Sequence, residues 1–251
     1  MAVVRWQRVA ELVADDVREQ ILSGRLESGA VLPKEELLRS SYPVSKASLR
    51  EAMRILEAEG LVTVRRGNVG GAVVRRPSAG NVAYALALVL RADGVLLPDV
   101  ARALREVEPL CAGMCAERSD RRRNVVPRLR AAHSQALSDV DDLARASQSS
   151  RRFHECLVEL CGNRSLAVMA GALETIWSSH ETGRTSACDP SAIPLAARRA
   201  ALDAHGELIQ LIAAGDVSGA RRLAGTHLDA VQSMPAPNYG EGRVVPLSLR
   251  Y

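Results

Sequence analysis

Apolar positions recur at helical spacing along most of the chain, with one interruption in its first third. Before that interruption we expect three short amphipathic helices, at residues 7–24, 34–41 and 45–60. The next stretch, "LVTVRRGNVGGAVV" (residues 61–74), joins two β-branched runs through a Gly/Asn turn, which predicts a β-hairpin. The N-terminal part is therefore expected to contain three helices followed by a hairpin.

From residue 82 onward the pattern is helical. Seven segments each carry an apolar stripe and are separated by short polar or Gly breaks: 82–92, 98–119, 123–146, 149–162, 165–180, 192–214 and 216–232. Short breaks between amphipathic helices predict an antiparallel helical bundle. We expect domains at residues 1–76 and 82–233, a linker at 77–81 and a tail at 234–251 that holds one short strand.

Composition narrows the class of protein. The longest apolar stretch, "VAYALALVL" (82–90), is too short to span a bilayer. The N-terminus turns acidic at once and lacks the apolar core of a signal peptide, which predicts a cytoplasmic location without membrane contact. The five Cys residues show no CxxC spacing, so we expect reduced thiols.

The charge is concentrated in the N-terminal part. The net charge is only +4, yet residues 39–76 hold eight Arg and Lys residues against three Glu. Such a block suits a polyanion, although a solvated face is the commoner origin of a charge run. Two helices, a tight turn and a hairpin with this charge form a winged helix-turn-helix, whose recognition helix begins near Ser45. The predicted fold class is therefore mainly α: a winged helix-turn-helix followed by an all-α antiparallel bundle.

A recognition helix enters the major groove of DNA by its first turns, where small hydroxyl and cationic side chains then contact bases and phosphates. Arg50 is expected to reach a guanine edge or a phosphate. The candidate DNA-binding residues are Lys34, Ser45, Lys46, Ser48, Arg50, Arg54, Arg65, Arg66 and Gly67.

Three stretches, "VREQILSGRLESGAVLP", "VSKASLREAMRILEAEGLV" and "RRGNVGGAVV", resemble the GntR superfamily of bacterial transcription regulators in order and spacing. The resemblance covers residues 9–76 and implies binding to operator DNA. Two positions depart from it: Glu36 stands where the family usually has a DNA-contacting Arg, and Pro43 replaces a turn Gly.

Three histidines in the second domain share an apolar helical context: His154, His205 and His227. His205 lies ten residues before Gly215 and His227 twelve after it, so a helical hairpin places them roughly 15 and 18 Å from the turn, nearly level. With His154 they form a candidate three-nitrogen site for a metal ion. Satisfied core histidines are the alternative.

The segments "LREVEPLCAGMCAERSD", "FHECLVELCGNRSL" and "AHGELIQLIAAGDVSGARRLAGTHL" resemble the FCD effector domain of the FadR-type branch. Many members of that branch bind a metal through one Asp and three His, and here Ser150 stands at the Asp position. The resemblance implies two outcomes: either the three His hold Zn²⁺ or Ni²⁺ with help from a carboxylate effector, or the pocket binds its effector without metal. His133 and His180 are possible substitutes for the missing ligand.

Arg105 and Glu108 match a further family pattern, in which the Arg faces the effector pocket. Arg105 either clamps an effector carboxylate or pairs with Glu108 along the helix. Together with Ser150 and the three His, Arg105 makes up the candidate effector site.

The function expected from these features is that of a homodimeric DNA-binding regulator and repressor. A small organic acid in the helical domain would modulate its binding to operator DNA. Two alternatives are a metal-dependent enzyme, with Glu155 or Glu174 as the acid or base, and a DNA-binding protein whose bundle only dimerises. A winged helix has no evident use in an enzyme, so we expect no enzymatic activity.

Overall fold

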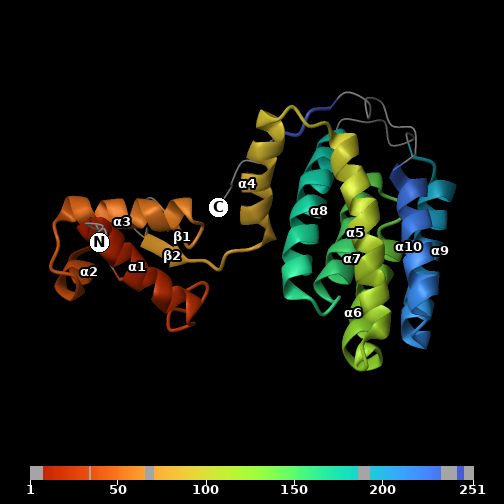
Figure 1. Ribbon diagram of the computed structural model, residues 1–251, viewed down its shortest axis with the longest axis horizontal. Helices are drawn as coiled ribbons and strands as arrows, with labels where there is room; N and C mark the ends of the chain where they lie inside the picture. The colour runs from red at the N-terminus through yellow and green to blue at the C-terminus, as the bar shows by residue number, and fades with distance from the viewer. Residues whose placement is uncertain (1–7, 34, 66–70, 186–192, 233–241, 246–251) are drawn as a thin grey trace, which may run out of the picture. The chain divides into compact units, whose positions relative to one another are not determined.

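The computed structural model describes residues 8–33, 35–65, 71–185, 193–232 and 242–245, and it divides into two compact units between Asn81 and Val82 (Figure 1). Within those ranges, no helix combines the length and apolar character needed to cross a bilayer. Each unit has its own hydrophobic core.

The N-terminal unit contains three helices and a two-stranded hairpin: α1 (Val9–Leu22), α2 (Glu35–Ser41), α3 (Lys46–Ala58), β1 (Val62–Arg65) and β2 (Gly71–Val74) (Figure 1). The strands pair antiparallel, with Val62 opposite Val74 and Arg65 opposite Gly71. The expected winged helix-turn-helix is confirmed.

Residues 29–32 run beside the hairpin. The N–H groups of Gly29 and Leu32 donate to carbonyl oxygens of β2, and Val31 forms a β-bridge with Val73. The core under the hairpin is formed by apolar residues of α1 and α3, among them Val17, Ile21, Leu49, Ala52 and Leu56.

Helix α3 begins and ends where the sequence signals predict. Ser45 caps it by accepting a hydrogen bond from the N–H of Ser48 at 3.1 Å, which satisfies one of the free donors of the first turn. Gly60 follows the helix with φ of +72°, a conformation that favours glycine. Its Cα hydrogen faces the side chain of Asn81, so a Cβ atom there would meet the Asn81 amide nitrogen at 1.9 Å.

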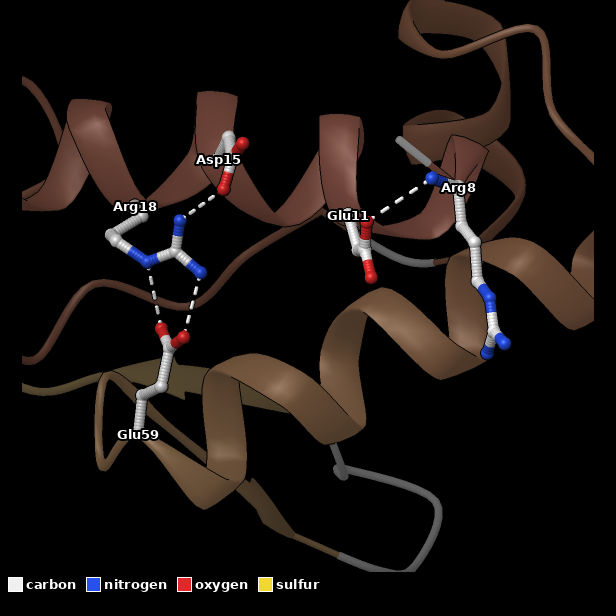
Figure 2. A network of polar contacts seen from close by, with 5 residues as sticks. All are labelled: Arg8, Glu11, Asp15, Arg18 and Glu59. Atoms are coloured by element: carbon white, nitrogen blue, oxygen red, sulfur yellow. Dashed lines mark hydrogen bonds and ion pairs between the residues drawn. The ribbon is translucent and has the colours of Figure 1, made fainter. Parts of the chain in front are cut away.

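An arginine on α1 fastens the end of α3 to the unit. Arg18 Nε and Nη2 donate to the two carboxylate oxygens of Glu59 at 2.8 and 2.7 Å, and Nη1 also contacts Asp15 (Figure 2). Such a bidentate pair fixes the geometry of both side chains more firmly than a single contact. At the start of α1, Glu11 accepts from the backbone N–H of Arg8 at 3.1 Å (Figure 2).

Helix α4 (Ala79–Ala92) begins inside the expected linker 77–81, and from Val82 onward it belongs to the C-terminal unit. The other elements of this unit are also helical: α5 (Leu97–Glu117), η1 (Arg121–Val125, a π-helical turn), α6 (Val126–Ser138), α7 (Leu143–Glu159), α8 (Arg164–Thr185), α9 (Leu195–Ala214) and α10 (Val217–Gln232). Helix α5 packs against α7, α8, α9 and α10, so it is the centre of the bundle (Figure 1). The predicted helical bundle is confirmed. Arg243 in the tail forms one β-bridge with Leu96.

The break between the third and fourth predicted helices of the bundle is misplaced. The sequence pattern gave helices at 123–146 and 149–162, but the break falls at residues 139–142. Asp142 accepts from the N–H of Arg145 at 3.0 Å and so caps the start of α7. Asp139, after the end of α6, accepts from Ser149 Oγ at 2.5 Å. These two carboxylates stabilise a helix start four residues earlier than the Ser-rich stretch where the break was expected.

Among the described cysteines, Cys111, Cys115, Cys156 and Cys161 are free thiols, and Cys188 lies outside the described residues. Burial raises the pKa of Cys111 to about 12. A thiol in this state is a poor nucleophile, so Cys111 contributes to packing in the bundle core.

Candidate functional site

The exposed face of α3 carries three cations at a spacing of four residues. Lys46, Arg50 and Arg54 have side chains that are 58%, 63% and 78% exposed. The opposite face of the helix is buried in the core of the unit. The helix therefore presents a row of positive charge from its first turn to its third, as a recognition helix requires.

A carboxylate on α2 pairs with two of these cations. Glu35 lies 3.2 Å from Lys46 Nζ and 3.4 Å from Arg50 Nε. Partial burial opposes ionisation, but the contacts with Lys46 and Arg50 win and lower the pKa of Glu35 below its ordinary value. The sequence analysis considered Glu36 and missed Glu35, since a contact across the turn between two helices leaves no mark in the hydrophobic pattern.

The remaining candidate DNA-binding residues either bond to each other or lie outside the described residues. The hydroxyl groups of Ser45 and Ser48 lie 2.9 Å apart, so they already bond to each other at the start of α3. Lys34, Arg66 and Gly67 lie outside the described residues, as do the side chains of Arg65 and Glu36.

In the helical unit, three histidines from three helices meet. His154 on α7, His205 on α9 and His227 on α10 are buried, and each offers one ring nitrogen within 4.8 Å of the others. The Nε2 atoms of His205 and His227 lie 3.0 Å apart. The structure therefore brings the two together across the α9–α10 hairpin, where Gly215 makes the turn with φ of +81°.

Ring packing fixes these side chains. The ring of His205 stacks on Phe153 with centroids 4.0 Å apart and planes 10° from parallel. His154 stacks on His227 with centroids 5.3 Å apart. Phe153 and His154 are neighbours on α7, so one turn of this helix holds a ring against each of the other two histidines.

The same burial keeps the imidazoles of His205 and His227 neutral. Burial, helped by the nearby His154 and His227, lowers the pKa of His205 well below its usual value. Burial and His154 lower the pKa of His227 to about 3. Neutral imidazole is the form that binds a metal.

The arrangement fits a metal that prefers nitrogen ligands. A tetrahedral Zn²⁺ with Zn–N bonds of about 2.0–2.1 Å places neighbouring nitrogens roughly 3.3 Å apart. The 3.0 Å between the Nε2 atoms of His205 and His227 is close to this value. Nδ1 of His205 is buried without a hydrogen-bond partner among the described residues, so on that side the ring is held by stacking on Phe153, while its Nε2 contacts Nε2 of His227.

A buried carboxyl group lies behind the cluster. Oε1 of Glu108 is 2.5 Å from Nδ1 of His154, and Oε2 of Glu108 has no hydrogen-bond partner among the described residues. The helical Arg105–Glu108 pair considered in the sequence analysis is therefore wrong. Arg105 instead contacts α10, through Asp229 at 3.3 Å and Gln232 at 2.5 Å.

The two substitute histidines lie apart from this cluster. His133 packs edge-on to His205 with ring centroids 6.4 Å apart, and it is not part of the group of converging nitrogens. His180 is held by backbone groups, since its Nδ1 lies 2.8 Å from the oxygen of Ile176 and its Nε2 accepts from the N–H of Val245.

A cavity opens beside His154 between α5, α7, α8, α9 and α10. Its volume is about 90 Å³, and it opens to solvent on one side. Its wall is largely apolar, and its polar side chains are Ser147, Ser150, Arg151, His154, Glu174, Arg198 and Gln232. Of the candidate effector residues, Ser150 and His154 belong to this wall, whereas Arg105, His205 and His227 are not among the described residues that form it.

Comparison with known proteins gives two family matches. Residues 9–74 match the family described as "Bacterial regulatory proteins, gntR family", and residues 99–230, more than half of the chain, match the FCD domain. The chain belongs to the GntR family and carries an FCD domain. It is a DNA-binding transcriptional regulator with an effector-binding domain, and not an enzyme.

Named relatives of this GntR-family chain are also regulators. A protein of Escherichia coli (strain K12), named for regulation of the L-lactate dehydrogenase operon, is 31% identical over 92% of this chain and 88% of its own. The transcriptional repressor NanR of Klebsiella aerogenes is 27% identical over 62% of this chain and 60% of its own. Among solved structures, the Streptococcus agalactiae GntR protein has a TM-score of 0.63 and 20% identity over 88% of this chain and 98% of its own, which shows a shared fold.

Proposed function

We propose that this GntR-family regulator is a homodimeric repressor that holds Zn²⁺ or Ni²⁺ through His154, His205 and His227. A small carboxylate effector binds beside the metal and changes the affinity of the protein for operator DNA. In this proposal residues 1–76 bind DNA, 77–81 link the domains, 82–233 bind effector and dimerise, and 234–251 form a tail.

The DNA-binding part rests on the face of α3. Lys46, Arg50 and Arg54 are exposed in a row, and the remaining contacts come from Lys34, Ser45, Ser48, Arg65, Arg66 and Gly67. A single winged helix reads only a few base pairs. A dimer doubles these contacts on a palindromic operator, which favours a homodimer.

One observation carries the metal and effector part: three buried histidines converge, and one of them, His154, lines a cavity that has room for a small ligand. Histidines that serve only to pack the core have no reason to bring their ring nitrogens together in this way. A metal bound there supplies a Lewis-acidic positive charge that attracts a carboxylate. Ser150 lines the same cavity as His154, and Arg105 donates to the Gln232 side chain, which also lines it.

The metal is tested by measuring metal content per chain with inductively coupled plasma mass spectrometry, on untagged protein purified without chelators. We expect near-stoichiometric Zn or Ni in the wild type and a loss in His227→Ala. The control His180→Ala removes a histidine outside the cluster and keeps the metal. Metal-free wild-type protein that also fails to take up added Zn²⁺ or Ni²⁺ contradicts the metal assignment.

The effector response is tested separately. Genomic fragments that bind the protein are selected in vitro, and their affinity is measured with and without small carboxylates, beginning with L-lactate because of the name of the E. coli relative. We expect at least one carboxylate to weaken binding. Light scattering during gel filtration, with and without DNA, decides whether the protein is a dimer.

A further inference from the structure

The helical bundle has one end that is strongly basic. The turns α5–α6, α7–α8 and α9–α10 lie at that end, because α5, α7 and α9 finish there and α6, α8 and α10 begin there (Figure 1). We call this surface the basic end and define it by residues 115–130, 156–167 and 211–222. It contains nine Arg against two Glu and two Asp. The α6–α7 turn at the opposite end (134–147) carries three Asp against one Arg, so the charge is polarised along the bundle.

Three arginines of the basic end hold the ends of helices. Arg118 Nη1 donates to the carbonyl oxygen of Leu160 at 3.0 Å, and Arg121 Nη1 donates to that of Arg118 at 3.0 Å. Arg122 Nε donates to the carbonyl oxygen of Ala213 at 3.1 Å. Each acceptor lies at the C-terminal end of a helix, where cations are favourable. These three arginines therefore have a structural role.

The other six arginines of the basic end are exposed: Arg123, Arg128, Arg130, Arg164, Arg221 and Arg222. Arg128 lies 3.4 Å from Glu159, and the other five form no ion pair within the described part of the chain. The nearby carboxylates are already engaged, since Asp120 pairs with Arg118 at 2.7 Å and Asp216 caps the start of α10. Most of the positive charge is therefore left without a partner.

Two of these cations stand where a helix disfavours them. Arg164 is the first residue of α8, and Arg128 is the third residue of α6. The N-terminal end of a helix carries partial positive charge, which stabilises anions rather than cations. The arginines add to the field of the helix ends instead of offsetting it. The basic end therefore presents a positive potential that an anionic partner would relieve.

The composition of the basic end favours phosphate over a protein surface. Among the described residues, none of the large hydrophobic side chains that are exposed belongs to it. Protein–protein interfaces usually have an apolar and aromatic centre, which this surface lacks. Its cations are all arginine, whose planar guanidinium group matches phosphate oxygens in a bidentate contact. A polymer of phosphates is therefore the partner that fits best.

The size of the surface suits a duplex. Neighbouring helices pack about 8–10 Å apart, so six helix ends cover a surface roughly 20 Å across. Duplex DNA carries one phosphate per about 1.7 Å of its axis, so about a dozen phosphates lie along such a length. A surface with five unpaired arginines can contact the phosphates on the near side of that segment.

We propose that the basic end is a second DNA-binding surface, which contacts the phosphate backbone of duplex DNA without reading its sequence. The segment that it holds is different from the one occupied by α3. A chain that is already bound to DNA through its winged helix brings this surface to a high local concentration of duplex, so even weak contacts count.

Two triple variants of the full-length protein form a matched pair. The test variant removes three unpaired cations of the basic end and keeps the arginines that hold helix ends: Arg123→Ala, Arg164→Ala and Arg222→Ala. The control removes three exposed cations elsewhere in the helical unit: Arg91→Ala, Arg102→Ala and Arg199→Ala. Circular dichroism shows that each variant is folded.

The first measurement is affinity for a duplex of about 60 base pairs of random sequence, by fluorescence anisotropy over a salt series. Each phosphate neutralised contributes about 0.9 to the slope of log affinity against log salt. We expect the slope of the test variant to fall by about two to three and that of the control by less than one. Equal slopes for the two variants overturn the proposal.

The second measurement asks whether two duplexes bind at once. The protein is saturated with a short operator fragment selected in vitro, and the labelled random duplex is then added. The wild type and the control should bind it in a ternary complex, whereas the test variant should keep only the operator. A wild type that takes up no second duplex overturns the proposal. Tighter binding of poly-L-glutamate than of DNA at equal charge also overturns it and indicates an acidic protein as the partner.

Discussion

Nδ1 of His154 lies 2.5 Å from Oε1 of Glu108, and both side chains are buried. A carboxylate in this position accepts a hydrogen bond from Nδ1–H of His154, which favours the tautomer whose Nε2 atom is the metal ligand. The same carboxylate supplies negative charge to a cluster in which Ser150 replaces the usual Asp. Glu108 is therefore a positioning residue for the proposed metal site, from a helix that contributes no histidine to it.

The first prediction concerns this carboxyl group. Glu108→Gln should lower the affinity for Zn²⁺ about 10- to 100-fold, the range typical for loss of a partner behind a metal-binding His. Competition with a colorimetric chelator measures the change. The control Glu106→Gln alters an exposed residue of the same helix and should bind Zn²⁺ like the wild type. Equal affinities for both variants would show that Glu108 serves packing alone.

The second prediction concerns the replaced ligand. Ser150→Asp places a carboxylate one turn before His154 on the cavity wall, so affinity for Zn²⁺ should rise about tenfold or more. The same chelator competition measures it. Ser147→Asp adds an equal charge to the same wall one turn further away and should raise affinity far less. If neither substitution changes metal affinity, the histidine cluster is structural.

The histidine cluster was largely predictable because its geometry is set by one helical hairpin. His205 and His227 were placed by counting residues on each side of Gly215, and a regular helix makes such a count reliable. The contact between Glu108 and His154 was not predictable in this way. It joins residues 46 positions apart on two helices whose relative rotation depends on packing.

The same distinction applies to the fold. The boundaries of α3 follow from Ser45 and Gly60, which are local signals. The break between α6 and α7 was missed because Asp139 and Asp142 lie in a polar stretch without Gly or Pro. There, the contact from Ser149 and the cap at Arg145 decide where the new helix begins.

The third prediction follows from a tyrosine of the N-terminal unit. Tyr42 donates to Asp16 at 2.5 Å, and burial together with Asp16 raises its pKa to about 12. An unfolded chain ionises its tyrosines near pH 10, so between pH 10 and 12 it binds fewer protons than the folded chain. Stability from this source is therefore complete below pH 10 and is lost as the pH rises towards 12.

Absorbance of tyrosinate at 295 nm tests this value. The difference between wild-type and Tyr42→Phe titrations isolates Tyr42, and its midpoint should lie about two units above that of a free tyrosine. Between pH 8 and 11 the wild type should also lose more stability to urea than the variant does. A difference titration centred near pH 10 contradicts the prediction.

The fourth prediction concerns the recognition helix. Arg50→Ala should weaken binding to operator DNA and reduce the slope of log affinity against log salt by about one, since one phosphate-neutralising cation is removed. Fluorescence anisotropy over a salt series measures both effects. The control Arg25→Ala removes an exposed cation outside α3. Unchanged affinity for Arg50→Ala would remove Arg50 from the DNA interface.

The fifth prediction follows from the position of Glu35 between Lys46 and Arg50. Any phosphate that approaches these cations must compete with the Glu35 carboxylate. Glu35→Gln should therefore raise affinity for DNA of random sequence more than affinity for the operator, and so lower specificity.

Glu27→Gln removes the same charge from an exposed position outside the α2–α3 pair and serves as the control. Ion pairs between exposed side chains contribute little, so a gain of only about twofold to fivefold on random DNA is expected. An equal gain for both variants would mean that net charge alone, rather than the contact with Lys46 and Arg50, sets the affinity.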